Sequence, residues 1–220
     1  MAALLLRVLR SLEKWDLLQD QSGEAVNEAL NLLVELQFLQ GDHLVSLQTH
    51  PAARQKCLEG HRRRMDEAHK AVVACQRGLI STHADLLECA RELGAVAEGA
   101  AKKRSAAAQV PVGSALQKTQ KPKLPVASSS TLSAGGGNVA LFQEEIAPFI
   151  AEVVDAYGDQ LTLQNSLITL YRERLSPADR KEMNRILAVW MDRPCEWAVA
   201  RFGRRRAVVR ELKKFLRLPA

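Results

Sequence analysis

The chain has 220 residues, of which 47% are apolar but only 5% aromatic, and it carries a formal net charge of +6. So few aromatic side chains count against the thick interiors of sandwich and α/β enzyme folds, which large rings usually anchor. Ala, Leu, Glu, Gln and Arg are abundant instead, and all five favour helices. The composition therefore predicts an all-α protein.

The positive charge is concentrated in two segments. Residues 201–217 hold eight basic side chains and one acid, and residues 99–140 hold six basic side chains and no acid. The remainder of the chain is therefore mildly acidic. No apolar run reaches the roughly 18 residues of a membrane span, and the four cysteines form no C-x-x-C pair. We expect a protein of the nucleus and cytoplasm that carries no disulfide and no zinc.

The first predicted helix covers residues 5–41. Its apolar residues alternate between spacings of three and four, the pattern of a coiled-coil seam: Leu5, Val8, Leu12, Trp15, Val26, Ala29, Leu33 and Leu36. Gln19, Ser22 and Gly23 interrupt this pattern. Since Gly costs about 1 kcal/mol relative to Ala inside a helix, we expect a kink or frayed turn at Asp20–Gly23. Residues 1–12 would also suit a mitochondrial presequence, but their apolar register continues into this helix.

The second predicted helix carries six apolar residues spaced seven apart: Leu58, Met65, Val72, Leu79, Leu86 and Leu93. A helix over Leu58–Val96 is about 58 Å long, and it is stable in water only if its apolar stripe is covered. The first helix, antiparallel across the loop at 41–51, covers much of this stripe. We expect a partner protein to cover the rest, so these six residues are candidate partner contacts.

The rest of the chain divides into three regions. Residues 99–140 are rich in Pro, Ser and Gly, which predicts a disordered basic linker after the helical region 1–98. A helical hairpin is expected at 141–198, with Pro148 near its start. The second helix of this hairpin begins at Ser176 and stops before Pro194. A basic amphipathic tail follows at 199–220.

Several single residues allow two interpretations. Trp15 and Trp190 are candidate partner contacts, because buried Trp often anchors interfaces, or they fill the cores of their own helix pairs. Pro194, four residues after Trp190, is a further candidate contact. Ser176 is either a helix cap or a proline-directed phosphosite, and Thr119 in the linker precedes a Gln, as in checkpoint-kinase sites.

The tail carries a dense group of cations, including Arg204, Arg205, Arg206, Lys213 and Lys214. It suits a nuclear-import signal, nonspecific contact with nucleic-acid phosphates, a membrane-surface helix, or a helix that packs or is solvated. Lys214–Leu218 also fits the basic-x-Leu-x-Leu pattern by which cyclins dock substrates.

Residues able to do chemistry do not cluster in the sequence. His61, His69 and His83 fall on one predicted helix, but none has a metal-binding residue four positions later. The triplet Gly135–Gly137 lacks the Lys-Ser/Thr that follows a phosphate-binding loop. We therefore expect no cofactor, no metal and no catalysis.

Five short motifs follow one another along the chain. Lys14–Asp20 has the form K-W-x-x-L-x-D, and Asn31–Leu36 the form N-L-x-x-x-L. Leu141-Phe142 with Pro148, then Tyr157–Leu163 of the form Y-x-x-x-L-x-L, and Trp190 with Pro194 come later. In order and spacing they resemble the cyclin-dependent kinase 2-interacting protein family. Two positions depart from it: Gln164 replaces a basic residue, and Cys195 replaces an aromatic one.

The resemblance implies an adaptor rather than an enzyme. Members of that family are linked to cyclin-dependent kinase 2 and replication initiation, to ATR-interacting checkpoint factors, and to a AAA+ ATPase assembly that remodels replisomes and ribosomal precursors. We therefore expect a scaffold subunit that connects cell-cycle kinase, DNA replication, DNA damage checkpoint and ribosome biogenesis factors. The heptads alone leave an alternative, a self-associating coiled-coil homo-oligomer of centrosome, spindle or tether type.

Overall fold

The computed structural model describes residues 1–41, 49–108, 139–174, 180–196 and 204–219. They form six elements: α1 (Ala2–Gln40), α3 (Pro51–Ala108), α4 (Val139–Arg174), α5 (Arg180–Asp192), the 3-10 turn η1 (Pro194–Glu196) and α7 (Arg204–Phe215). No strand occurs in this part of the chain, and the predicted all-α fold is confirmed. Of the helices described, none combines the length and apolar character that crossing a bilayer requires.

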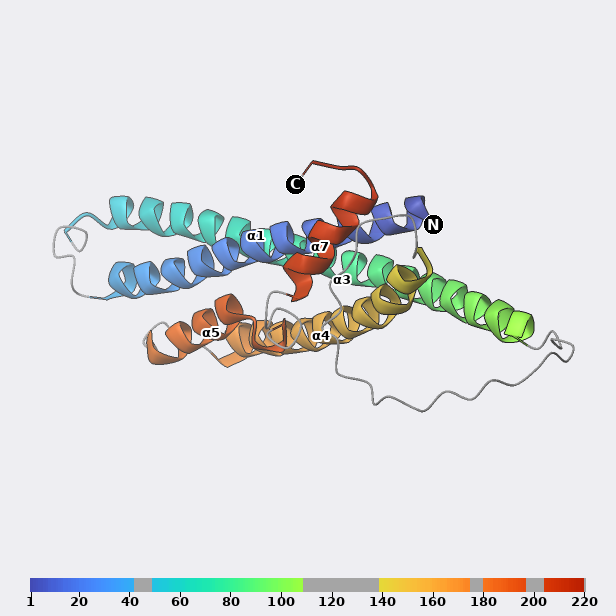
Figure 1. Ribbon diagram of the computed structural model, residues 1–220. Coiled ribbons are helices and arrows are strands. Elements are labelled where there is room, and N and C mark those ends of the chain that lie inside the picture. The colour runs from blue at the N-terminus through green and yellow to red at the C-terminus, as the bar shows by residue number, and fades with distance from the viewer. Residues whose placement is uncertain (42–48, 109–138, 175–179, 197–203, 220) are drawn as a thin grey trace, which may run out of the picture.

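Helices α1 and α3 run antiparallel and form the longest contact of the fold (Figure 1). Arg7 near the start of α1 pairs with Glu88 of α3 at 2.6 Å, whereas Arg64 of α3 pairs with Glu28 further along α1 at 3.2 Å. Because all four side chains are exposed, these pairs report the register of the two helices more than they stabilise it.

Helix α4 lies antiparallel to α3 and joins it through polar side chains. His83 Nε2 donates to the carbonyl oxygen of Val154 at 2.9 Å, and Gln76 Nε2 donates to Oδ1 of Asn165 at 3.0 Å. The sequence left open whether the two helical halves pack together. The structure shows that they do, and α4 shares one apolar core with α1 and α3.

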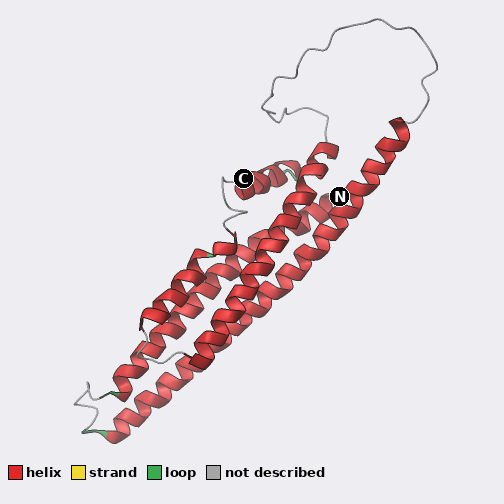
Figure 2. Ribbon diagram, turned by 90° about the horizontal axis from the view of Figure 1, so that it is seen from below, coloured by secondary structure: helices red, strands yellow, loops and turns green. Residues whose placement is uncertain are grey.

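The fourth side of the bundle is shared by two short helices. Helix α5 runs antiparallel to the distal half of α1, with Arg180 5.5 Å from the ring centre of Phe38. Helix α7 crosses the proximal half of α1 (Figure 1), and its Leu212 is completely buried. The result is an elongated bundle, as Figure 2 shows from below.

The largest core cluster takes side chains from four helices. Its fully buried members include Leu5, Leu12 and Trp15 of α1, Leu79 and Leu86 of α3, Phe149, Ile150 and Tyr157 of α4, and Leu212 of α7. A second cluster lies beside α5 and contains Val26, Leu30, Val72, Met183 and Trp190. The apolar faces of all the long helices are thus turned toward the inside of the bundle.

Three expectations about the helices are wrong. Helix α1 continues unbroken through Asp20–Gly23, where a kink or frayed turn was expected. Helix α3 begins at Pro51 and ends only at Ala108, so residues 99–108 are helical rather than linker; residues 109–138 lie outside the described part. Pro148 lies well inside α4, which begins at Val139.

Candidate functional site

The most distinctive polar side chains of the molecule meet where α1, α4 and η1 come together. The indole of Trp15 stacks on the ring of Tyr157, with ring centres 3.9 Å apart and planes inclined by 6°. Its Nε1–H donates to Oε1 of Glu196 at 3.0 Å. We call Trp15, Gln19, Tyr157, Gln164 and Glu196 the polar centre; none of the five is more than 6% exposed.

A chain of amides extends the polar centre across α1 and α4. Gln19 Nε2 donates to the same Glu196 oxygen at 3.3 Å, and Gln164 Nε2 donates to Oε1 of Gln19 at 2.7 Å. Gln19 was expected to interrupt the apolar stripe of α1. It interrupts that stripe because it faces polar groups contributed by residues far away in the sequence, and a buried amide that is hydrogen-bonded is compatible with a continuous helix.

Glu196 reaches this position because the chain turns sharply after α5. Pro194 cannot continue a helix, and Arg193 before it adopts a left-handed backbone conformation with φ of 49°. The turn η1 then directs Glu196 into the bundle. Burial raises the pKa of Glu196, and hydrogen bonding to Trp15 and the nearby charges of Arg193 and Arg205 oppose that rise.

Arg205 covers the polar centre from the side of α7. Its guanidinium pairs with Asp16 at 2.7 Å, donates to the carbonyl oxygen of Leu12 at 3.2 Å, and lies 5.7 Å from the ring centre of Tyr157. Its side chain is only 17% exposed. Arg205 therefore attaches α7 to both α1 and α4.

A second junction, one turn away, joins α5 to α1. Trp190 Nε1–H donates to Oγ of Ser22 at 3.1 Å, and Arg193 pairs with Asp20. A Cβ on Gly23 would stand 2.6 Å from the sulfur of Met191, so α5 approaches α1 at a residue without a side chain. These contacts explain why Ser22 and Gly23 lie on the buried face of an unbroken helix.

Not every polar atom in and beside the polar centre has a partner. The hydroxyl of Tyr157, Nε2 of Gln160 and Oε1 of Gln164 are buried and make no hydrogen bond within the described residues. Burial also raises the pKa of Tyr157 well above its ordinary range. Because an orphaned buried polar atom costs about 1–3 kcal/mol, these three groups lower the stability of the junction.

The structure places most candidate partner contacts in the interior of the helix bundle. Six of them are at most 7% exposed: Trp15, Val72, Leu79, Leu86, Leu93 and Trp190. Since α1, α4 and α5 already cover these side chains, we assign them to the core and not to a surface for another protein. Pro194 is exposed at the start of η1.

Two residues of the heptad series remain half-exposed. Leu58 and Met65 line a groove of about 180 Å³ at the far end of the α1–α3 pair, where the hydroxyl of Tyr171, near the end of α4, lies 3.6 Å from the sulfur of Met65. The other lining residues are Leu36, Gln40, His61, Arg62 and Asp66. Together with the exposed Pro194, these two are the predicted contact positions that another protein could still reach.

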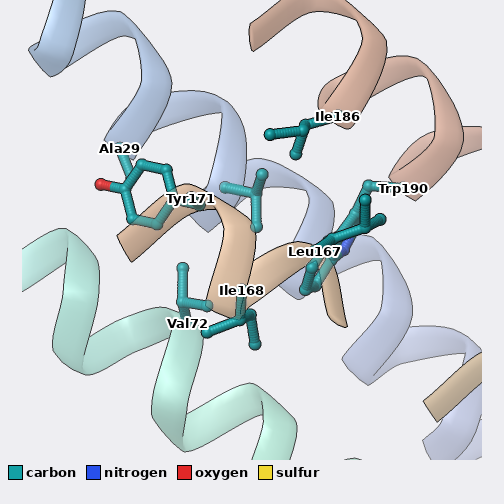
Figure 3. Close-up of a pocket in the computed structure, with 8 residues that line it drawn as sticks. Ala29, Val72, Leu167, Ile168, Tyr171, Ile186 and Trp190 are labelled. Carbon is teal, nitrogen blue, oxygen red and sulfur yellow. The ribbon is translucent and has the colours of Figure 1, made fainter. Parts of the chain in front are cut away.

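Two further candidate positions, Val72 and Trp190, border a small cavity between four helices. It measures about 20 Å³ and is lined by Val26, Ala29, Val72, Leu167, Ile168, Tyr171, Ile186 and Trp190 (Figure 3). A space of this size with an apolar lining is a packing gap rather than a ligand site.

The three histidines of α3 form hydrogen bonds to the neighbouring helices α1 and α4. His61 Nε2 donates to the carbonyl oxygen of Leu32 at 2.7 Å, and His69 Nε2 lies 2.6 Å from the hydroxyl of Tyr171; His83 bonds Val154 as described above. No group of three His, Cys, Asp or Glu side chains able to hold a metal ion occurs among the residues that the structure describes.

The basic tail is a packed helix from Arg204 to Phe215. Arg205 and Lys213 face α1, where Lys213 pairs with Glu13 at 3.4 Å. Arg206 is exposed, and Lys214 pairs with Glu211 of its own helix at 2.7 Å. The phosphosite candidates Thr119 and Ser176 lie outside the described residues.

All motifs on which the family resemblance rests lie in α1, α4, α5 or η1, and three of them supply residues to the two junctions. Comparison of the chain with protein-family models, curated proteins and solved structures finds no match.

Proposed function

We propose that this protein is a non-catalytic adaptor of the cyclin-dependent kinase 2-interacting type, a scaffold subunit of a AAA+ ATPase assembly in the nucleus and cytoplasm. One observation supports this proposal most. The motif residues Trp15, Tyr157 and Trp190, which are far apart in the sequence, take part in two adjacent junctions. The similarity to that family therefore concerns residues that hold this fold together.

The architecture suits a scaffold. Every side chain of the polar centre is buried, so this group positions helices and is out of reach of a substrate. The groove at Leu58 and Met65 offers apolar surface at one end of the bundle, bordered by Arg62 and Asp66. We propose that a helix of the ATPase assembly occupies this groove, because half-exposed apolar side chains between charged ones are typical of a helix-binding groove.

The alternative, a self-associating coiled coil, has less support. Self-association through the heptad series needs that seam to be free, yet Val72, Leu79, Leu86 and Leu93 are buried against helices of the same chain. A homodimer would have to use other surfaces or open the bundle.

Affinity purification of the tagged chain from dividing cells, followed by mass spectrometry, tests the proposal. We expect subunits of a AAA+ ATPase, together with cyclin-dependent kinase 2 and its cyclin or ATR-interacting checkpoint factors. If neither the ATPase nor any cell-cycle kinase component is recovered, the proposal is wrong. A stable homodimer by light scattering, without other partners, would favour the coiled-coil alternative.

The variant Leu58→Glu tests the groove. We expect it to lose the ATPase, because a charge at the groove wall opposes an apolar partner helix. Leu17→Glu is the matched control, since Leu17 is 57% exposed on the opposite face of α1 from Trp15. Equal recovery of the ATPase with both variants would show that its binding site lies elsewhere on the protein.

A further inference from the structure

The cations of α7 divide into an inner and an outer set. On the inner face, Leu212 is fully buried, and Val208, Val209 and Leu216 pack against the core. Arg205 and Lys213 flank this face and pair with Asp16 and Glu13 of α1. These two cations are therefore largely neutralised by α1 and serve to dock the helix.

The outer set points away from the bundle. Arg206, Arg210 and Lys214 follow one another at intervals of four residues, which places them on one face of α7. Arg217 lies two residues after the helix ends at Phe215, in a turn where its φ is 55°. All four are exposed, and Arg206, Arg210 and Arg217 make no ion pair with any described residue. We call these four residues the outer row.

The surroundings of the outer row reinforce its charge. Arg10 and Lys14 are exposed on α1, within one turn of Glu13, the residue that pairs with Lys213. The acids closest to α7, Glu13 and Asp16, are already engaged by the inner set. Apart from Lys214, which pairs with Glu211, the cations of this surface are uncompensated, and such a surface attracts polyanions over a distance of several ångströms.

We propose that the outer row binds the phosphate backbone of duplex nucleic acid without reading its sequence. Guanidinium groups suit this ligand, because their planar donors match phosphate oxygens. The row itself holds no aromatic residue, and beside it only Phe215, which is 39% exposed, could supply the base stacking on which binding to single strands depends. This activity goes beyond the adaptor role and does not depend on it.

A membrane surface is the less suitable polyanion. A helix that binds at the interface must insert its apolar face into the lipid. In α7 that face is occupied by the bundle, where Leu212 is 0% exposed. Only charge would remain to attract α7 to lipid headgroups, whereas a duplex needs nothing more.

The test measures binding of the full chain to a fluorescent 20-base-pair duplex, in one arm RNA and in the other DNA, over a range of salt concentrations. The variant R206Q/R210Q/R217Q removes three cations of the outer row. The control R63Q/K70Q/R77Q removes three exposed cations of α3 and changes the net charge equally. All six side chains are exposed, so thermal unfolding should be unchanged in both variants.

We expect the outer-row variant to bind at least about tenfold more weakly at about 100 mM salt, and to lower the slope of log K against log salt by about two to three. The control should change affinity by less than about twofold. Binding in the RNA arm alone or the DNA arm alone would identify the duplex recognised.

Three results would overturn the proposal: no binding by the unmodified chain, equal losses in both variants, or binding that prefers single strands. Vesicles of phosphatidylserine and an acidic peptide are run alongside. Tighter binding to either one, lost in the outer-row variant, would assign the row to that ligand and reject nucleic acid. A failure of these assays leaves recovery of the ATPase unaffected, so the two proposals are tested separately.

Discussion

The carboxyl group of Glu196 joins η1 to α1, and its ionisation should be visible in the stability of the protein. Burial raises its pKa above the ordinary value of 4.5. A carboxyl that binds its proton more tightly in the folded state stabilises the fold most at low pH. That contribution is lost as the pH rises from the unfolded value through the raised folded value.

Glu196→Gln should reveal this titration, because the amide keeps an acceptor oxygen for Trp15 and Gln19 but carries no charge. We expect the variant to gain unfolding free energy relative to the parent between about pH 4 and pH 7, measured by urea unfolding. A difference that does not vary with pH would show that Glu196 titrates normally.

Glu196→Ala serves as the companion variant. It removes the acceptor and leaves the buried N–H groups of Trp15 and Gln19 without a partner, so we expect a loss of about 1–3 kcal/mol. Because Ala also removes the titrating carboxyl, the loss should shrink as the pH rises, and Glu196→Ala should stay less stable than Glu196→Gln by a constant amount.

Gly23 allows a test of the unbroken helix. Ala at this position should raise the unfolding free energy by up to about 1 kcal/mol, because Gly is unfavourable inside a helix. The added Cβ would meet the sulfur of Met191 at 2.6 Å, but Met191 is 56% exposed and its side chain can move aside. A loss above about 1 kcal/mol in urea unfolding would instead mean that α5 needs this close approach.

These residues show where sequence reasoning failed and why. Polar residues on an apolar stripe indicate a break when only neighbours along the chain are considered. The partners of Gln19 and Ser22 are Glu196, Gln164 and Trp190, more than 140 residues away. The sequence does hold a usable signal: polar residues on the apolar face of a helix need polar partners from another part of the chain.

Helix α7 should behave as part of the core rather than as a dispensable tail. Leu212→Ala should cost about 2–5 kcal/mol, because it leaves a gap between α7 and the bundle. Leu218→Ala is the matched control, since Leu218 is 39% exposed, and we expect it to cost less than about 0.5 kcal/mol. If both variants lose little and equal unfolding free energy, measured by thermal unfolding, α7 is only loosely attached.

The heptad series of α3 illustrates a different limit. Its spacing correctly predicted a long helix with a buried stripe, and Leu79, Leu86 and Leu93 are indeed almost fully buried. Spacing carries no information on which chain covers the stripe. Here α1 and α4 of the same protein do so, and sequence reasoning had assigned part of that role to a partner.

The bundle as a whole should unfold in one step. The largest core cluster joins α1, α3, α4 and α7, so neither half retains a complete interior without the other. We expect urea transitions followed by far-UV circular dichroism and by tryptophan fluorescence to coincide. Two separated transitions would show that the N-terminal pair is stable alone.

Coexpression of residues 1–108 and 139–220 as separate chains gives a second test. The two fragments should copurify, because their apolar faces complement each other along α3 and α4. Recovery of each fragment alone and soluble would contradict a shared core.

Composition and periodicity were sufficient to predict the all-α class and the approximate place of each long helix, but not the end of α3 at Ala108 or the start of α4 at Val139. They could not predict how α5 and α7 share the fourth side of the bundle. That arrangement depends on two junctions, at Trp15 and at Trp190, in which the hydrogen bond of each indole joins residues more than 160 positions apart.

The bond between Trp15 and Glu196 spans 181 residues, and this separation affects how the protein is made. A ribosome adds about 5–20 residues per second, so roughly 10–40 s pass between synthesis of these two partners. During that interval the nascent chain presents the indole of Trp15 and the apolar face of α1 without α4 or α7 to cover them. Synthesis must pass α7 before the core can close, so we expect chaperones to bind the unfinished chain.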